Sequence, residues 1–218
     1  MQFFMKLFFT ALLFCVSLSA LAYFFWYKPK FNKHTPVKTF AAKKDETSKA
    51  VAERQQAHAA AILNYAKKHS CNTQYCFLVD MKVHSGSNRF FVYNLAKDSV
   101  EIEGLVTHGS GKTNSSDVQF SNEEGSLCTS LGKYKIGSSY NGKFGLAYKL
   151  YGLDASNSNA FNRFVVLHSH SCVPNTETAP FPICESWGCP TVAPSFLTAL
   201  AKYIDKADKP VLLSIYNE

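Results

Sequence analysis

Cys189 and His168 are the two residues of this sequence whose types and placement suit nucleophilic chemistry. Cys189 lies in the stretch ESWGCPTV, directly after Gly188, and His168 ends the apolar run RFVVLH. A cysteine nucleophile needs a base that takes its proton, a turn that exposes the sulfur, and donors for an oxyanion. His168 would project from a strand, Gly188 lets the backbone approach closely, and a helix expected after Cys189 supplies N–H groups. The pattern predicts a cysteine nucleophile with His168 as its base.

Two other functions remain open for Cys189. It could belong to a metal site drawn from a pool of five residues: His168, His170, Cys172, Cys184 and Cys189. Their spacing lacks the tight C-x2-C or H-x3-H pairs that make a zinc prediction specific, so we expect no metal. It could also form a disulfide with Cys184. His170 would share a strand face with His168, where it orients the site, binds substrate or is solvated.

The cysteine count favours disulfides. Of the seven cysteines, six lie outside an apolar N-terminal segment, and an even number in an exported chain indicates bridges. Cys71 and Cys76 flank a short turn and form the first expected pair. Cys172 and Cys184 bracket a Pro-rich loop and form the second. This pairing leaves Cys128 and Cys189 as free thiols.

The N-terminus reads as a membrane-targeting segment. Residues 7–27 carry no formal charge and are about as long as a bilayer-spanning helix. The ALA at residues 20–22 resembles a signal-peptidase site, so a retained signal anchor and a cleaved signal peptide are both open for residues 1–27. Six lysines follow the segment between residues 28 and 44, and by charge alone they would keep the remainder of the chain inside the cell.

The rest of the chain divides into a linker, a helix and one domain. Residues 28–46 lack apolar periodicity and read as a linker, whereas the Ala-rich residues 47–70 have the spacing of an amphipathic helix. Residues 71–218 show short alternating strands broken by Gly, Ser and Asn, with one short helix after a Pro-Ser start past Cys189. We expect a mainly β domain with a few short helices.

Charge limits the classes of partner. The net charge is +7, and part of it comes from the lysines next to the membrane segment, which could contact anionic lipid. The domain has no run of Arg or Lys interleaved with aromatic residues, so we expect no nucleic-acid partner. An acidic polymer such as a cell wall suits this charge.

Several sequence blocks together resemble the YkuD-like L,D-transpeptidases. HSHSCV followed by ESWGCPTV resembles the family's histidine and S/T-x-G-C signature, in the branch of murein L,D-transpeptidase catalytic domains that carries S-W-G-C-P. The blocks VTHGSG, FSNEEGSLCTSLGKYKIG, YNGKFGLAYKLYGLD and NAFNRFVVLHS occur in the family's order, and the resemblance covers about residues 78–194. It implies an L,D-transpeptidase-like β-sandwich or barrel that needs no cofactor.

The resemblance also implies a reaction. Cys189 would form a thioester with a peptidoglycan stem tetrapeptide, releasing its terminal D-alanine, and an amine of a second stem would resolve it into a cross-link. Backbone N–H groups around Gly188 and Cys189 would hold the oxyanion, and Ser186 would shape the turn. With water as acceptor the enzyme would be an L,D-carboxypeptidase, and with Cys189 in a disulfide the chain would be a non-catalytic wall-binding module.

An envelope substrate and an oxidising compartment outweigh the charge of the flanking lysines in our prediction of location. We expect the periplasmic or extracytoplasmic face of the cell envelope, with the N-terminal segment in the inner membrane unless it is cleaved. Protein partners and oligomeric state are not predicted.

Departures from the family pattern leave the donor carboxylate without an assigned partner. Ser169 stands where the family usually has Gly, and Thr191 stands where the wider superfamily often has Arg. Ser169, His170, Trp187 and Tyr140 are the substrate-binding candidates. Trp187 either walls the pocket or packs under the turn, and Tyr140 either lines a groove or belongs to the core. An unusual Cys128 would allow a redox lock if it lies near Cys189.

Overall fold

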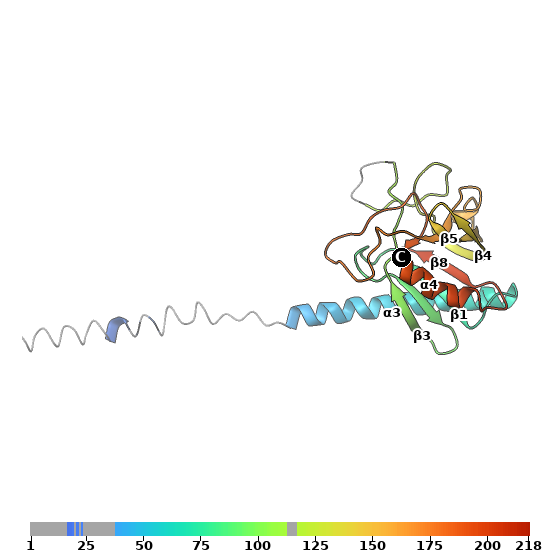
Figure 1. Cartoon of the computed structure of the whole chain (residues 1–218). Coiled ribbons are helices and arrows are strands. Elements are labelled where there is room, and N and C mark those ends of the chain that lie inside the picture. Colours follow the sequence, from blue (N-terminus) through green and yellow to red (C-terminus); the bar gives the residue numbers. More distant parts are fainter. Residues whose placement is uncertain (1–16, 20, 22, 24–37, 113–116) are drawn as a thin grey trace, which may run out of the picture. The chain divides into compact units, whose positions relative to one another are not determined.

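The sheet that carries the domain has eight strands. The structure, a computed structural model, describes residues 17–19, 21, 23, 38–112 and 117–218 (Figure 1). It divides into two units, Met1–Ser48 and Lys49–Glu218, and the sheet belongs to the second. The strands are β1 (Tyr75–Asp80), β2 (Phe90–Asn94), β3 (Ser99–Gly104), β4 (Gly132–Gly142), β5 (Gly145–Gly152), β6 (Val166–Ser169), β7 (Thr191–Val192) and β8 (Leu212–Tyr216).

The strand order is β3-β2-β1-β8-β4-β5-β6-β7. The β1–β8 and β6–β7 pairs are parallel, and the other neighbouring pairs are antiparallel. Val106, just after the edge strand β3, forms an antiparallel bridge with Val192 of the opposite edge strand β7. The two edges of the sheet are thereby joined, and the mainly β prediction is confirmed.

Alternation along the strands gives the sheet two apolar faces. In β1, Phe77 and Val79 point to the main core, while Cys76 and Leu78 point to the other side. This is the period of two that a strand imposes on its side chains. Because β1, β2 and β8 are apolar on both sides, each face of the sheet must pack against another element to be shielded from water.

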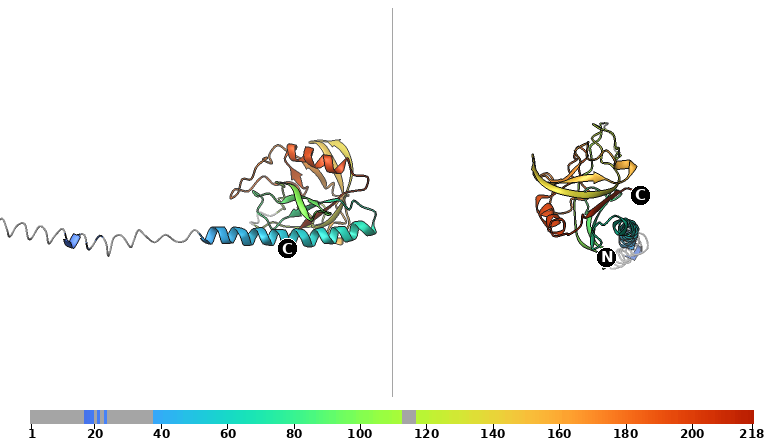
Figure 2. Two further views of the ribbon diagram at one scale, coloured as in Figure 1. Left: turned by 90° about the horizontal axis from the view of Figure 1, so that it is seen from below. Right: turned by 90° about the vertical axis from the view of Figure 1, so that its right-hand side faces the viewer.

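Two helices cover these faces. The helix α4, Pro194–Ile204, buries Leu197 and Leu200 in the main core, and Pro194 stands at its N-terminus where proline is tolerated. From residue 49 onward, α3 packs Ala59, Ile62 and Ala66 against the opposite face. Figure 2 shows the two helices on opposite sides of the sheet.

The helix before the domain is longer than the sequence predicts. α3 spans Lys38–Lys68, so it begins inside residues 28–46, which we expected to be a linker. The predicted membrane segment, residues 7–27, lies for the most part outside the described residues. Within the described part of the chain, none of the helices combines the length and apolar character needed to cross a membrane.

The expected Cys71–Cys76 disulfide is wrong, because both thiols are free. Hydrogen bonds close the turn between them instead, since Asn72 Oδ1 accepts from the N–H groups of Gln74 and Tyr75 at 2.9 and 2.8 Å. The Cys71 thiol donates to the His69 carbonyl at 3.6 Å. Cys76 is buried under α3, and burial raises its pKa to about 12.

An ion pair fixes α3 to the sheet. Asp80 at the end of β1 is fully buried, and Arg54 of α3 reaches its Oδ2 with Nε at 2.8 Å and Nη2 at 2.7 Å. A carboxylate withdrawn from water is stable only while its charge and lone pairs are met. Asp80 Oδ1 also accepts from the Lys82 N–H at 3.0 Å.

Replacing Arg54 by methionine should leave the Asp80 carboxylate without its cation. We expect the free energy of unfolding to fall by about 2–4 kcal/mol, because breaking a buried pair strands a charge. Urea unfolding followed by circular dichroism measures it. Lys49→Met, which removes the exposed Lys49–Glu53 pair at 3.9 Å, is the matched control and should leave stability unchanged. An equal loss in both variants would contradict this account of α3.

Candidate active site

The turn that presents Cys189 depends on Gly188. Gly188 has a φ of +107°, and a Cβ there would lie 2.6 Å from the Cys128 carbonyl oxygen. Only glycine suits both the left-handed conformation and the close approach. Ser186 completes the turn, because its Oγ donates to the Cys189 carbonyl at 2.7 Å and accepts from the Gly188 N–H at 3.2 Å.

The Cys189 thiol is free and half-buried. Its Sγ donates to the Phe164 carbonyl at 3.7 Å. Burial raises the pKa of the Cys189 thiol, while the Val166 N–H and the Arg163 guanidinium act against that rise. At neutral pH the sulfur is therefore a neutral thiol in the resting protein.

His168 projects from β6 next to β7, where it pairs with Thr191. Its Nδ1 lies 3.1 Å from the Ser169 carbonyl and its Nε2 lies 3.0 Å from Thr191 Oγ1. A carbonyl only accepts, so Nδ1 carries the proton and Nε2 has the lone pair, which the threonine hydroxyl meets. Burial lowers the pKa of His168, the Ser169 carbonyl opposes this, and His170 adds to it. The imidazole is neutral and ready to accept a proton at Nε2.

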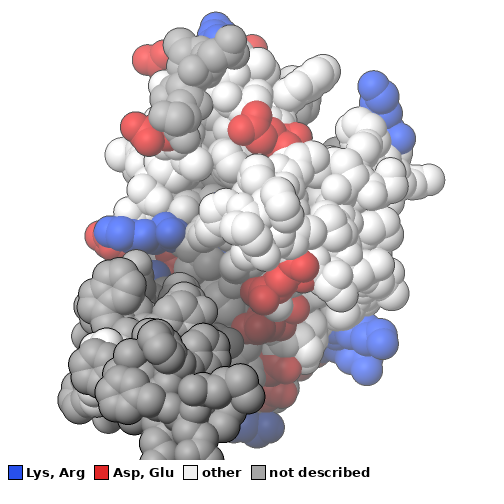
Figure 3. Space-filling view, turned by 90° about the vertical axis from the view of Figure 1, so that its left-hand side faces the viewer, with Lys and Arg blue, Asp and Glu red and all other residues white. Residues whose placement is uncertain are grey.

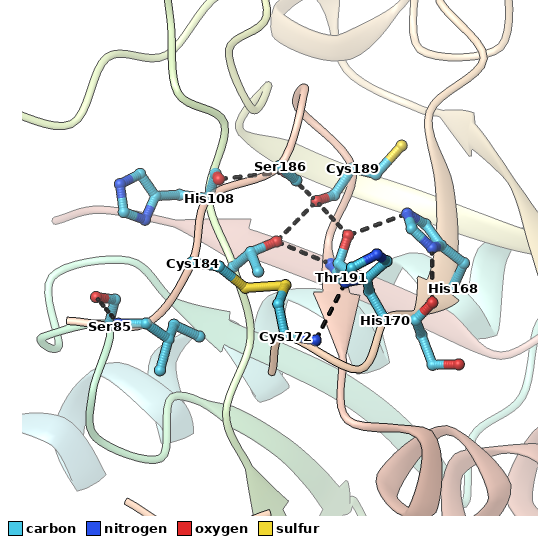
Figure 4. Close-up of a disulfide and its surroundings, with 12 residues drawn as sticks. Ser85, His108, His168, His170, Cys172, Cys184, Ser186, Cys189 and Thr191 are labelled. Carbon is cyan, nitrogen blue, oxygen red and sulfur yellow. Dashed lines mark hydrogen bonds between the residues drawn. A yellow bond between two sulfur atoms is a disulfide. The ribbon is translucent and has the colours of Figure 1, made fainter. Parts of the chain in front are cut away.

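One pocket of about 340 Å³ contains both groups. The residues that line it are Thr107, Lys143, Phe144, His168, His170, Cys172, Glu185, Ser186, Trp187, Cys189 and Thr191. Figure 4 shows the Cys189 sulfur and the His168 ring on the same side of Thr191. The nucleophile and the base predicted from the sequence therefore share one cavity, although Nε2 is bonded to Thr191 and not to the thiol.

Two of the substrate-binding candidates line this pocket and two do not. His170 lies in it, with Nδ1 accepting from the Cys172 N–H at 3.1 Å. Trp187 also lines it and is 80% exposed, so the indole is not packed under the turn. Tyr140 on β4 is 40% exposed and lies outside the lining residues. Ser169 contributes its carbonyl to His168 and does not line the pocket.

A disulfide fixes one wall of the pocket. Cys172 and Cys184 are bonded, as the sequence predicts, and close the Pro-rich loop between them (Figure 4). Because Cys184 is used here, the alternative Cys184–Cys189 bridge is not formed. Cys128 is free as well, and its thiol donates to the Ser126 carbonyl at 3.4 Å.

Phe144 and Thr191 are site residues that our reasoning from the sequence missed. Phe144 stacks on His168 and meets His170 edge-on, each at a ring-centroid distance of 5.3 Å. It is half exposed at the tip of the β4–β5 hairpin, and a large aromatic between two glycine turns was the available signal. For Thr191, we noted from the sequence only that the wider superfamily often has an arginine at this position.

A buried arginine and histidine support the turn from behind. Arg89 Nη2 lies 3.0 Å from His108 Nδ1, and the His108 carbonyl accepts from the Ser186 N–H at 2.8 Å. Burial and the neighbouring Arg89 lower the pKa of His108 to about 4, so the imidazole is neutral. Its Nε2 faces the Glu185 carboxylate at 3.6 Å, which orients this acidic residue of the pocket.

The described ranges hold no group of three or more His, Cys, Asp or Glu side chains that could bind a metal ion. Figure 3 shows one face of the molecule, on which several acidic side chains lie close together near the centre and basic side chains lie mostly toward the rim.

Solved structures with detectable similarity share little sequence with this chain. The cell-shape-determining protein Pgp2 from Campylobacter jejuni is 14% identical, with a TM-score of 0.44 over 66% of this chain and 48% of that one. The Ldtfm–avibactam carbamoyl enzyme is 11% identical, with a TM-score of 0.43 over 66% and 49%. An L,D-transpeptidase from Xylanimonas cellulosilytica is 13% identical, with a TM-score of 0.36 over 65% and 60%. The match spans about half the length of the first two.

The family assignment comes from the sequence match. No curated protein matches this chain. The family model described as L,D-transpeptidase catalytic domain matches residues 46–214, which is more than half of the chain and includes both His168 and Cys189. The chain therefore belongs to the L,D-transpeptidase catalytic domain family.

Proposed function

We propose that this protein is a peptidoglycan L,D-transpeptidase that works through a Cys189 thioester. The observation that carries the proposal is a free cysteine and a neutral histidine that line one pocket, with His168 Nε2 accepting from Thr191 Oγ1. We place the enzyme on the extracytoplasmic face of the cell envelope, where its substrate is found, with the N-terminal segment as signal or anchor.

The first half of the reaction is acylation. The sulfur of Cys189 attacks the carbonyl carbon of the diamino acid, and the thiol proton passes to His168 Nε2. The amide bond to the terminal D-alanine breaks, the imidazolium returns the proton to the leaving amine, and a thioester remains. The Gly188 N–H already donates to Ser186, and no acceptor for the Cys189 N–H is found among the described residues. The Cys189 N–H is therefore our candidate oxyanion donor.

Thr191 allows this proton transfer without losing its hydrogen bond to His168. Its Oγ1 lies 3.0 Å from His168 Nε2 and 3.4 Å from the Cys189 carbonyl. When Nε2 gains a proton, the threonine hydroxyl can turn its hydrogen to the carbonyl and accept from Nε2–H. The base keeps its orientation in both protonation states.

In the second half, an amine of another stem attacks the thioester. Its proton passes to His168, and the sulfur leaves as a thiolate that is then protonated. Water in place of the amine would make the enzyme an L,D-carboxypeptidase. The half-exposed Phe144 and the exposed Trp187 favour an amine acceptor, because they offer apolar surface for a second stem. A free Cys189 argues against a wall-binding module whose cysteine is bridged.

Incubation of the full-length chain with a carbapenem tests the nucleophile. We expect one stoichiometric covalent adduct by intact mass, mapped to Cys189, because resemblance to this family implies acylation by such compounds. Cys189→Ala should give none, and His168→Ala should react at least about tenfold more slowly. An unmodified, folded protein with a free Cys189 would refute the proposed chemistry.

The products formed from purified tetrapeptide muropeptides distinguish the two acceptors. We expect cross-linked dimers whose yield rises with acceptor stem concentration, because the amine competes with water for the thioester. Mass spectrometry of the digest measures dimers against tripeptide monomers. Cys189→Ala supplies the blank, and tripeptide alone at every acceptor concentration would assign the protein as a carboxypeptidase.

The protonation states of the pair predict the direction of the pH dependence. The pKa of Cys189 is raised and that of His168 is lowered, so at neutral pH the pair is thiol and neutral imidazole. Acylation should therefore fall only on the acid side, where His168 is protonated, and rise on the alkaline side as thiolate forms. Second-order acylation rates across pH measure this, with chemical stability of the carbapenem as the control. A maximum at acid pH would contradict the assignment.

A further inference from the structure

Two backbone groups of the segment that joins Arg163 to β6 interact with the sulfur of Cys189. The Phe164 carbonyl accepts from Sγ at 3.7 Å, and the Val166 N–H interacts with the same sulfur. Phe164 has a φ of +57°, a left-handed conformation that bulky residues rarely adopt, yet its side chain is 82% exposed. Two backbone hydrogen bonds, from the Phe164 N–H to the Phe161 carbonyl at 3.1 Å and from the Val165 N–H to the Ala160 carbonyl at 2.9 Å, hold this left-handed turn and so place the Phe164 carbonyl at the sulfur.

Three hydrogen bonds connect Arg163 to the segment next to the Cys189 turn. Nη1 donates to the Ser121 carbonyl at 2.8 Å, and Nη2 donates to Ser126 Oγ at 3.2 Å and to the Cys128 carbonyl at 2.6 Å. That Cys128 carbonyl is the group against which Gly188 packs, and Nη2 itself lies 3.4 Å from where a Gly188 Cβ would be. The guanidinium therefore lies against the residue that precedes the nucleophile.

The charge of Arg163 is not neutralised locally. Its partners are carbonyls and a hydroxyl, and within residues 49–112 and 117–218 no carboxylate lies within ion-pair distance of it. The half-buried guanidinium gives a positive potential around the adjacent sulfur. The Arg163 charge favours the Cys189 thiolate, whereas His168 is neutral.

We propose that Arg163 is the positioning residue of the nucleophile, which holds the Cys128 segment against the Gly188 turn and stabilises the Cys189 thiolate by its charge. The proposal rests on Cys189 being the nucleophile proposed above. Position 191, two residues after the cysteine, holds threonine, so the cation reaches the sulfur from a segment 26 residues earlier in the chain. Arg163 acts through its hydrogen bonds to the Cys128 segment, which supports the Gly188 turn, and through the electric field of its charge. It does not contact substrate.

The ionisable groups around the sulfur come from several elements. Tyr134 on β4 interacts electrostatically with Cys189. His168 on β6 lines the same pocket as Cys189, together with Lys143, His170 and Glu185. Burial raises the pKa of Tyr134 to about 12, and the pKa of His168 is lowered. The alkaline midpoint of Cys189 reactivity therefore belongs to Cys189 itself.

Alkylation by iodoacetamide across pH tests this role in the full-length chain, with the modified peptide identified by mass mapping. Arg163→Gln keeps an amide donor for the Cys128 carbonyl but loses the charge, and Arg163→Lys keeps the charge. For Arg163→Gln we expect the Cys189 midpoint to rise by about one pH unit and the rate at neutral pH to fall about threefold, because higher thiolate nucleophilicity offsets part of the tenfold loss. Arg163→Lys should stay close to the unmodified chain.

The controls separate a positioning role from simple stability. Arg54→Met removes another arginine that holds two segments together, so it should lower the unfolding midpoint and leave the alkylation profile unchanged. An unchanged profile in Arg163→Gln would overturn the proposal, as would an equal shift in Arg163→Lys. Should Arg163→Gln not fold, Arg163→Met carries the same prediction. A carbapenem-inert protein with the expected alkylation shift would refute the proposed function and leave this inference standing.

Discussion

The site depends on one short parallel pairing, that of β6 with β7. It consists of two residue pairs, His168 with Thr191 and Ser169 with Val192. The first pair places His168 beside the strand that follows Cys189. The second continues through the bridge from Val192 to Val106, which joins the two edges of the sheet. Closing the sheet and assembling the cysteine–histidine pair are therefore the same structural event.

Burial decides the chemistry of this pair. A cysteine and a histidine exposed to water would titrate independently, and a close ion pair would favour thiolate and imidazolium. Here both groups are withdrawn from water, which disfavours the charged form of each, so the neutral pair is the resting state.

Features set by local pattern could be predicted from the sequence, and features set by contacts between distant segments could not. Alternation of apolar residues predicted the strands, and the Pro-rich loop predicted the Cys172–Cys184 disulfide. The Cys71–Cys76 prediction failed because Asn72 closes that turn with hydrogen bonds, which cysteine counting cannot reveal. Phe144 reaches His168 only through the pairing of β5 with β6.

Arg163 shows that a charged residue can act on a site from which it is distant in sequence. The position two residues after Cys189, where an arginine would be sought, holds Thr191, and its hydroxyl is hydrogen-bonded to His168 Nε2. A cation there would compete for His168 and raise the cost of protonating it, since like charges in a shared pocket repel. Supplying the positive charge from behind the turn, through Arg163, leaves the pocket side of the sulfur to the neutral base. Phe164, whose left-handed turn is closed by local backbone hydrogen bonds, links Arg163 to the strand that carries His168.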